Sequence, residues 1–136
     1  MTGFGRVSKA LCRLLYALGA NVTVAARRVS DRALAGTLGY AAVPLTALAD
    51  AGAFDVVFNT VPALIFDEPR LRALAPSTLI IDLASRPGGV DFAAAAGLGL
   101  KTIWALSLPG RVAPKSAGII LKDTVLNILK EEGEAV

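Results

Sequence analysis

The stretch that decides the fold lies at the start of the chain, where residues 3–8 read Gly-Phe-Gly-Arg-Val-Ser and lead directly into a helical segment. The pattern has the shape G-x-G-x-x-[G/A], with Ser8 in the third small position. Gly3 permits a tight turn, and Gly5 lets backbone N–H groups approach a pyrophosphate at the positive end of the following helix. A glycine turn without any ligand has the same pattern, so the context must decide.

The segments that follow alternate between short apolar runs and helix-period stretches, as in βαβ units on a parallel sheet. We expect strands at 21–26, 40–43, 55–60, 78–83 and 101–106, and helices at 6–18, 30–38, 46–51, 68–75, 91–96 and 114–130. Ser30 and Thr46 are the candidate caps of their helices. The chain is therefore predicted to be α/β, a Rossmann-like doubly wound parallel sheet forming a single dinucleotide-binding domain over residues 1–136.

Two of these helices carry apolar stripes that are predicted to face the core. The stripe of the first helix consists of Val7, Leu11, Leu14, Leu15 and Leu18, and that of the last helix of Ala117, Ile120, Leu121, Val125, Ile128 and Leu129.

One requirement of the glycine motif is not met, because only Met1 and Thr2 precede Gly3. A strand of about five residues should stand there, and it is central in the strand order 3-2-1-4-5-6. We therefore expect that the chain is truncated, with its first strand and its partner domain missing. We also expect this chain by itself to bind nucleotide weakly. The facing strands then leave a gap, close onto each other, or accept a strand from another chain.

The position that reads the ribose falls about 20 residues after the glycines, at Ala25 or Ala26, where an acidic residue would bind the 2′-hydroxyl. No acid is present, and Arg27 and Arg28 follow at once. Two guanidinium groups suit a 2′-phosphate, which favours NADP over NAD, although a solvated basic loop has the same sequence. The expected cofactor-binding residues are Gly3, Phe4, Gly5, Arg6, Val7, Ala26, Arg27, Arg28, Asn59, Thr60, Val61 and Pro62.

Ligands of open α/β sheets lie beyond the carboxyl ends of the strands, and the later strands end in unusual loops. The turn at 86–89 reads Arg-Pro-Gly-Gly, which combines a rigid and a permissive backbone with a projecting arginine. Asp82, at a strand end, is suited to orient such an arginine or simply to cap the strand. The expected site for a small dicarboxylate substrate consists of Arg86, Arg111, Lys115 and Ser116.

Composition excludes several other classes of function. The net charge is only +3 and the basic residues are scattered, which argues against nucleic-acid binding. The chain has no histidine, so we expect no metal site. The sequence contains no apolar run of about 18 residues, so no membrane span is predicted. The single cysteine, Cys12, is consistent with a reducing cytoplasm.

The chain resembles the A subunit of dipicolinate synthase, specifically its C-terminal NAD(P)-binding domain. The likeness is carried by GFGRVSKAL at 3–11, ALGANVTVAAR at 17–27, FNTVPALIF at 58–66, LIIDLASRPGGVDF at 79–92 and LPGRVAPKSAGIIL at 108–121. The resemblance implies oxidation of dihydrodipicolinate to dipicolinate with NAD(P)+ during sporulation, in the mother-cell cytoplasm. It also implies that the partner is the flavoprotein-like B subunit of dipicolinate synthase, and we expect a homo-oligomer.

The proton released in such a reaction would pass to water, Asp82 or Ser85, and the sequence does not choose among them. Two other interpretations stay open. One is an NADP-dependent oxidoreductase of the shikimate-dehydrogenase type, which would need a Lys/Asp pair from a separate domain. The other is a nucleotide-binding or assembly fragment that performs no catalysis.

Overall fold

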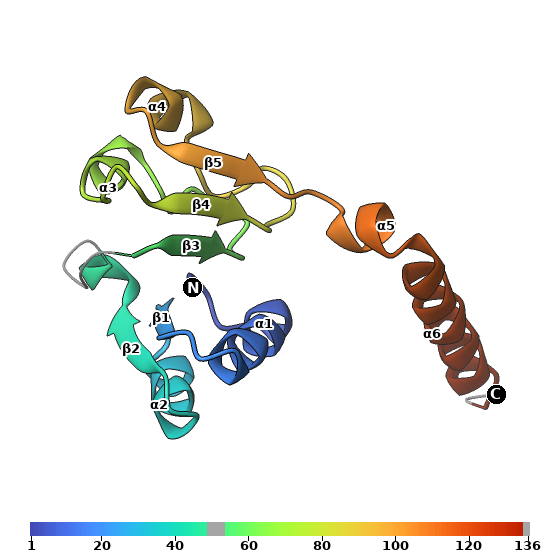
Figure 1. Cartoon of the computed structure of the whole chain (residues 1–136). Coiled ribbons are helices and arrows are strands. Elements are labelled where there is room, and N and C mark those ends of the chain that lie inside the picture. Colours follow the sequence, from blue (N-terminus) through green and yellow to red (C-terminus); the bar gives the residue numbers. More distant parts are fainter. Residues whose placement is uncertain (49–53, 135–136) are drawn as a thin grey trace. The chain divides into compact units, whose positions relative to one another are not determined.

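The computed structural model describes residues 1–48 and 54–134 (Figure 1). The chain divides into two compact units, Met1–Leu106 and Ser107–Val136, and each is considered by itself.

The first unit is an α/β unit whose strands are all parallel, as predicted. β1 pairs with β2, and β3, β4 and β5 lie side by side in that order (Figure 1). The elements in chain order are α1 (Arg6–Ala17), β1 (Thr23–Ala26), α2 (Val29–Thr37), β2 (Ala41–Pro44), the 3₁₀ helix η1 (Leu45–Ala47), β3 (Val56–Asn59), α3 (Glu68–Arg72), β4 (Leu79–Asp82), α4 (Phe92–Gly97) and β5 (Lys101–Trp104).

The first residues of the chain join the two sets of strands. Thr2 forms parallel bridges to Ala25 on β1 and to Asn59 on β3. The Thr2 N–H donates to the Phe58 carbonyl at 2.9 Å, and the Ala25 N–H donates to the Met1 carbonyl at 2.8 Å. The order across the unit is therefore β2, β1, the short segment at Thr2, β3, β4 and β5, as the doubly wound pattern predicts.

Apart from the bridges that Thr2 forms, the space between β1 and β3 is open. A cavity of about 610 Å³ lies there, lined by residues that include Met1, Leu15, Val22, Val56 and Phe58. Because both strands bond to the same residue, their separation at that end is one strand wide. Within this chain, the two strands therefore do not close onto each other.

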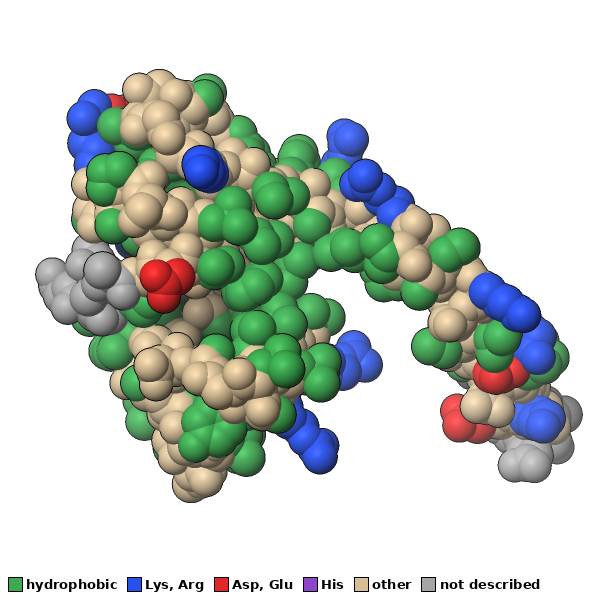
Figure 2. Space-filling model, in the orientation of Figure 1, with side chains coloured by type: hydrophobic (Ala, Val, Ile, Leu, Met, Phe, Trp, Pro, Cys, Tyr) green, Lys and Arg blue, Asp and Glu red, His purple; other side chains and the backbone are tan. Residues whose placement is uncertain are grey.

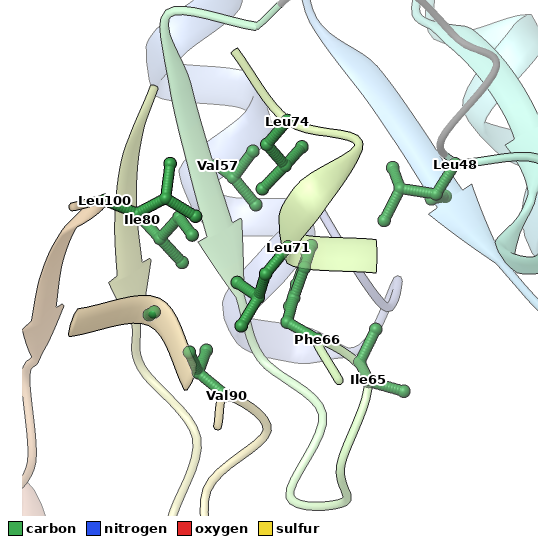
Figure 3. Close-up of a cluster of buried hydrophobic side chains, with 11 residues drawn as sticks. Leu48, Val57, Ile65, Phe66, Leu71, Leu74, Ile80, Val90 and Leu100 are labelled. Carbon is green, nitrogen blue, oxygen red and sulfur yellow. The ribbon is translucent and has the colours of Figure 1, made fainter. Parts of the chain in front are cut away.

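The core lies mainly between β3 and β4 and the helices α3 and α4. Phe66, Leu71 and Ile80 are fully or almost fully buried there, with Val57 and Leu100 beside them (Figure 3). A second cluster forms where α1 and α2 pack on β1; its buried members are Phe4, Cys12, Val22, Val24, Ala26, Ala35 and Tyr40.

The predicted core face of α1 is only partly correct: Leu11 and Leu15 are partly buried, and Leu15 packs against the second cluster. The helix buries Ser8 and Cys12, whereas Val7 is 61% exposed, Leu14 63% and Leu18 84%. The glycine turn sets the rotation of the helix and brings it close to the strand, and such close approach requires small side chains on the inner face. Apolar periodicity alone therefore identified the helix and part of the side that packs, but not its buried centre at Ser8 and Cys12.

Several helix starts also differ from the prediction. α2 begins at Val29 with Arg28 as its N-cap residue, so Ser30 is not the cap. Thr46 lies inside η1, and the predicted continuation of that helix to residue 51 lies outside the described residues. The side chains that do cap helices are Asp67 on α3 and Asp91 on α4, which accept from the N–H groups of the third helical residues.

The second unit consists of α5 (Leu108–Val112) and α6 (Pro114–Glu134). The helix predicted at 114–130 is present, and α5 was not predicted. The stripe that was expected to face a core is exposed, with Ile120 at 64%, Leu121 at 66% and Leu129 at 62%. Figure 2 shows hydrophobic and charged side chains interspersed along α6. Among the described residues, no helix is long and apolar enough to cross a membrane.

Candidate functional site

The glycine turn leaves the start of α1 open. Gly3 has φ +80°, and a Cβ there would lie 2.8 Å from Val61 Cγ2 and 2.9 Å from Thr60 Oγ1. Gly5 is the N-cap residue, and a Cβ on it would meet nothing within 4 Å. No side chain caps α1 and its first turn has no acidic residue. The first N–H groups of this helix therefore have no side-chain acceptor among the described residues, which is the arrangement that binds phosphate.

A cleft of about 510 Å³ lies beside this helix start. It is lined by the carboxyl end of β1, the glycine turn and the loop after β3. This is expected for strands that end at one edge of a parallel sheet. All of the predicted cofactor residues line it except Val7 and Asn59. The lining residues are Gly3, Phe4, Gly5, Arg6, Lys9, Ala25, Ala26, Arg27, Arg28, Asp31, Leu45, Thr60, Val61 and Pro62.

Three side chains of this cleft were missed by the sequence analysis: Lys9, Asp31 and Leu45. Lys9 is one helical turn beyond the glycine motif, and its Nζ lies 5.5 Å from the centre of the Phe4 ring. Asp31 stands in the first turn of α2. The acidic residue was expected at the end of β1, whereas Asp31, in the first turn of α2, lines the same cleft.

The loop after β1 is held by Arg32. Its guanidinium donates to the carbonyls of Ala26 and Arg27, each at 2.8 Å. Arg27 and Arg28 are exposed and take part in none of the ion pairs found within the described part of the chain. Both guanidinium groups are thus available to an anionic ligand in the cleft.

A buried chain of hydrogen bonds lies behind the cleft wall and is centred on Asn59. The Asn59 Oδ1 accepts from the Thr2 hydroxyl at 2.6 Å and from the Val61 N–H at 3.1 Å. Its Nδ2 donates to the Val61 carbonyl at 3.0 Å and to Asp82 Oδ1 at 2.8 Å. Asn59 is fully buried, so it shapes the 59–62 loop rather than lining the cleft.

A second bond connects this loop to the helix. The hydroxyls of Ser8 and Thr60 lie 2.7 Å apart, and the Thr60 hydroxyl also contacts the Thr2 carbonyl at 2.9 Å. Ser8 therefore does more than permit close packing, since it joins the start of α1 to the loop after β3.

Asp82 lies at the end of β4 and has no exposed surface. Its Oδ1 accepts from Asn59 Nδ2 and from the Ala84 N–H at 3.0 Å, and its Oδ2 accepts from the Gly89 N–H at 2.7 Å. These bonds favour a bracing role over that of a proton acceptor. Ser85, the other catalytic candidate, is exposed on the turn that Asp82 holds, and its carbonyl accepts from the Gly88 N–H at 2.8 Å.

Arg86 projects from the same turn and lies over an aromatic platform. Its guanidinium carbon is 5.9 Å from the centre of the Trp104 ring, and Phe92 stacks on Trp104 at 5.4 Å. The indole N–H donates to the Ala84 carbonyl at 3.3 Å. The arginine is exposed, so its charge can meet an anion at this edge of the sheet.

The other predicted substrate residues belong to the second unit. Arg111 is in the last turn of α5, and Lys115 and Ser116 are in the first turn of α6; all three are exposed. Their association with Arg86 stays a prediction. No cluster of three or more potential metal ligands occurs in residues 1–48 and 54–134.

Two titratable groups in the first unit are perturbed by burial. Desolvation lowers the pKa of the Met1 amino group, which donates to the Thr23 carbonyl at 2.8 Å. Desolvation also raises the pKa of the Cys12 thiol above its ordinary value. Both groups lie away from the cleft, so neither belongs to the candidate site.

Comparison with known proteins connects this geometry to one enzyme. No family model matches the chain. Its sequence is 41% identical to the A subunit of dipicolinate synthase from Bacillus subtilis (strain 168) over 130 residues, which are 95% of this chain and 44% of that protein. The resemblance to the A subunit of dipicolinate synthase is thereby confirmed. The chain spans less than half the length of this relative.

Solved structures agree. The crystal structure of the A chain of dipicolinate synthase from Bacillus subtilis superposes with a TM-score of 0.94 at 39% identity, over 99% of this chain and 46% of that one. The structure of the A subunit from Bacillus halodurans gives 0.87 at 39% identity, over 94% of this chain and 44% of that one. The Rossmann-like α/β fold is therefore confirmed.

A more distant structure shares the fold. The quinone oxidoreductase from Thermus thermophilus, whose structures include a complex with NADPH, superposes with a TM-score of 0.58 at 20% identity. The match covers 88% of this chain and 40% of that one.

Proposed function

We propose that this chain is the nicotinamide-nucleotide-binding part of the A subunit of a dipicolinate synthase, which oxidises dihydrodipicolinate to dipicolinate. The observation that carries the proposal is the cleft at the open start of α1, where the glycine turn meets Arg27, Arg28 and the 59–62 loop. The identity to the Bacillus subtilis enzyme supports the reaction.

The residues of the cleft fit a dinucleotide. The N–H groups at the start of α1 suit the pyrophosphate, and the absence of a Cβ at Gly5 lets a phosphate approach them. The 59–62 loop forms the opposite wall, where Thr60 and Pro62 would hold the nicotinamide end. When bound, the nicotinamide supplies the acceptor for a hydride from the substrate ring.

The substrate is a dianion, so its carboxylates require cations beside the cofactor. Arg86 is proposed to bind one carboxylate of the substrate. In the second unit, Arg111, Lys115 and Ser116 stay candidate substrate-binding residues. The chain then acts mainly by orienting two rings. The proton released on aromatisation is proposed to pass to water, and Ser85, the other catalytic candidate, is exposed on the same turn as Arg86. Asp82 is assigned to positioning because it is fully buried and fully bonded.

NADP is proposed as the preferred cofactor. Arg27 and Arg28 offer two exposed guanidinium groups where the 2′-phosphate would lie. Asp31 opposes this choice, because a carboxylate on the same cleft repels a phosphate and would accept a bond from a free 2′-hydroxyl.

The resemblance to dipicolinate synthase also supports proposals about the setting. We propose the flavoprotein-like B subunit of dipicolinate synthase as the partner, a homo-oligomeric assembly, and action in the cytoplasm during sporulation. A second candidate function is nucleotide binding or assembly without catalysis. The chain spans less than half the length of its curated relative, so the catalytic proposal depends on regions of the A subunit outside this chain.

The test is calorimetric titration of NADPH and NADH into the wild-type chain and into Gly5→Val. A valine at residue 5 points into open space, so it fills the phosphate position without disturbing the fold. Gly36→Val is the matched control, since Gly36 also has free space around it and lies outside the cleft. The proposal requires NADPH binding that Gly5→Val abolishes and Gly36→Val retains. Equal binding by both variants would place the phosphates elsewhere.

Catalysis is tested separately. The assay follows the formation of NADPH from NADP+ and dihydrodipicolinate, with the remaining regions of the A subunit present. Binding of NADPH without turnover under these conditions would support the second candidate function. Turnover that requires Arg86 would support the first.

A further inference from the structure

The turn that carries Arg86 and the loop that walls the cofactor cleft are held by one carboxylate. Residues 84–89, which we call the Arg86 turn, are bonded to Asp82 at both ends, through the Ala84 N–H at 3.0 Å and the Gly89 N–H at 2.7 Å. The same carboxylate accepts from Asn59 Nδ2 at 2.8 Å, and Asn59 anchors the 59–62 loop. Asp82 is thus the single group to which both segments are tied.

The direction of every bond in this network is determined. The Val61 N–H can only donate, so the Asn59 atom that accepts from it must be oxygen. Asn59 therefore turns its NH₂ group toward Asp82. The three partners of Asp82 are then all donors, and only a side chain with two acceptor oxygens satisfies them. An amide of the same shape would place its own NH₂ against at least one of these donors.

The two segments also pack closely against each other at Gly89. A Cβ on Gly89 would lie 2.2 Å from Asn59 Nδ2, 2.7 Å from the Val61 carbonyl and 2.9 Å from the Ala63 carbonyl. The Gly89 carbonyl accepts from the N–H groups of both Ile65 and Phe66 at 2.9 Å. The Arg86 turn is therefore in direct backbone contact with the segment that continues the 59–62 loop.

We infer that Asp82, acting through Asn59, is a positioning residue that sets the cofactor cleft and the substrate arginine in one arrangement. The inference rests on the proposed function for the identity of the ligands. Asp82 does not touch either ligand; it holds the 59–62 loop on one side and the Arg86 turn on the other. A misplacement of about 1 Å at either segment is enough to lower the reaction rate by about 100-fold.

The chain offers a built-in reporter for the Arg86 turn. Trp104 is its only tryptophan, and it contacts the turn through Arg86 and through the Ala84 carbonyl. Its fluorescence therefore reports whether the turn keeps its place, without any ligand present.

The experiment compares Asp82→Asn with Thr78→Val. Thr78 is the matched control, because it is also fully buried and also loses a bond, from its hydroxyl to the Phe54 carbonyl at 2.7 Å, but at the opposite end of β4. We expect Asp82→Asn to shift the Trp104 emission, to raise its quenching by acrylamide, and to weaken NADPH binding about tenfold. Thr78→Val should change none of these three quantities: the Trp104 emission, its quenching by acrylamide, or NADPH binding. A shift of equal size in both variants, or none in Asp82→Asn, would overturn the inference and leave Asp82 a purely structural residue.

Hydrogen exchange of the wild-type chain decides the question if Asp82→Asn does not fold. The Val61, Ala84 and Gly89 amides all depend on the Asn59–Asp82 pair, so they should open together, with protection factors equal within about tenfold. Independent opening of Val61 and Gly89 would refute the shared anchor. Failure of the chain to bind NADPH in the presence of the rest of the A subunit would instead refute the proposed function, since the exchange and Trp104 measurements need no nucleotide.

Discussion

Replacing Gly3 by alanine separates the two roles of the glycine motif. Gly3 has φ +80°, where an L-residue costs about 1–2 kcal/mol. The new Cβ would also lie 2.8 Å from Val61 Cγ2 and 2.9 Å from Thr60 Oγ1. Neither neighbour gives way easily, because Thr60 is bonded to Ser8 and to the Thr2 carbonyl. Overpacking of this kind costs roughly 1–3 kcal/mol.

The two terms together predict a loss of about 2–5 kcal/mol in the free energy of unfolding, a large share of the roughly 5–15 kcal/mol that a domain usually has. Gly5→Ala should lose about 0.5 kcal/mol or less, because its Cβ meets nothing and its backbone is extended. Urea unfolding followed by far-ultraviolet circular dichroism measures both variants. Equal stability of the two would refute the assignment of Gly3 to the turn and Gly5 to the ligand.

Three further predictions concern single features of the first unit. Exchanging both Arg27 and Arg28 for alanine should weaken NADPH binding at least about tenfold and leave NADH binding unchanged; an equal effect on both nucleotides in calorimetry would contradict the 2′-phosphate role. Arg86→Ala should raise the KM for the dicarboxylate about tenfold or more and the KM for the cofactor little, whereas a change in stability alone would mean that the turn is structural. The buried Cys12 thiol should react with a disulfide reagent only on unfolding, and rapid labelling of the native chain would contradict its burial. Desolvation raises the pKa of this thiol in the folded chain. The free energy of unfolding should therefore fall as pH rises through the ordinary thiol value of 9.0, because the unfolded thiol loses its proton first.

Local sequence determined the elements and the general place of the cleft. The glycine motif, the apolar runs and the helix-period segments each report a local backbone pattern, so they identified the parallel α/β unit. Arg27 and the 59–62 loop follow directly after strands, and the carboxyl ends of parallel strands meet at one edge. For that reason the cleft contains nearly all of the residues predicted for it.

Tertiary structure decided what each side chain faces. Val7 and Leu14 share an apolar stripe, yet they are exposed, because the tight glycine turn directs Ser8 and Cys12 inward. Asn59 was predicted to bind cofactor, but its partners Thr2 and Asp82 are distant in sequence and hold it behind the cleft wall. Hydrogen bonds of this kind leave no periodic trace in the chain, because they depend on the register between strands rather than on the spacing of residues along one of them.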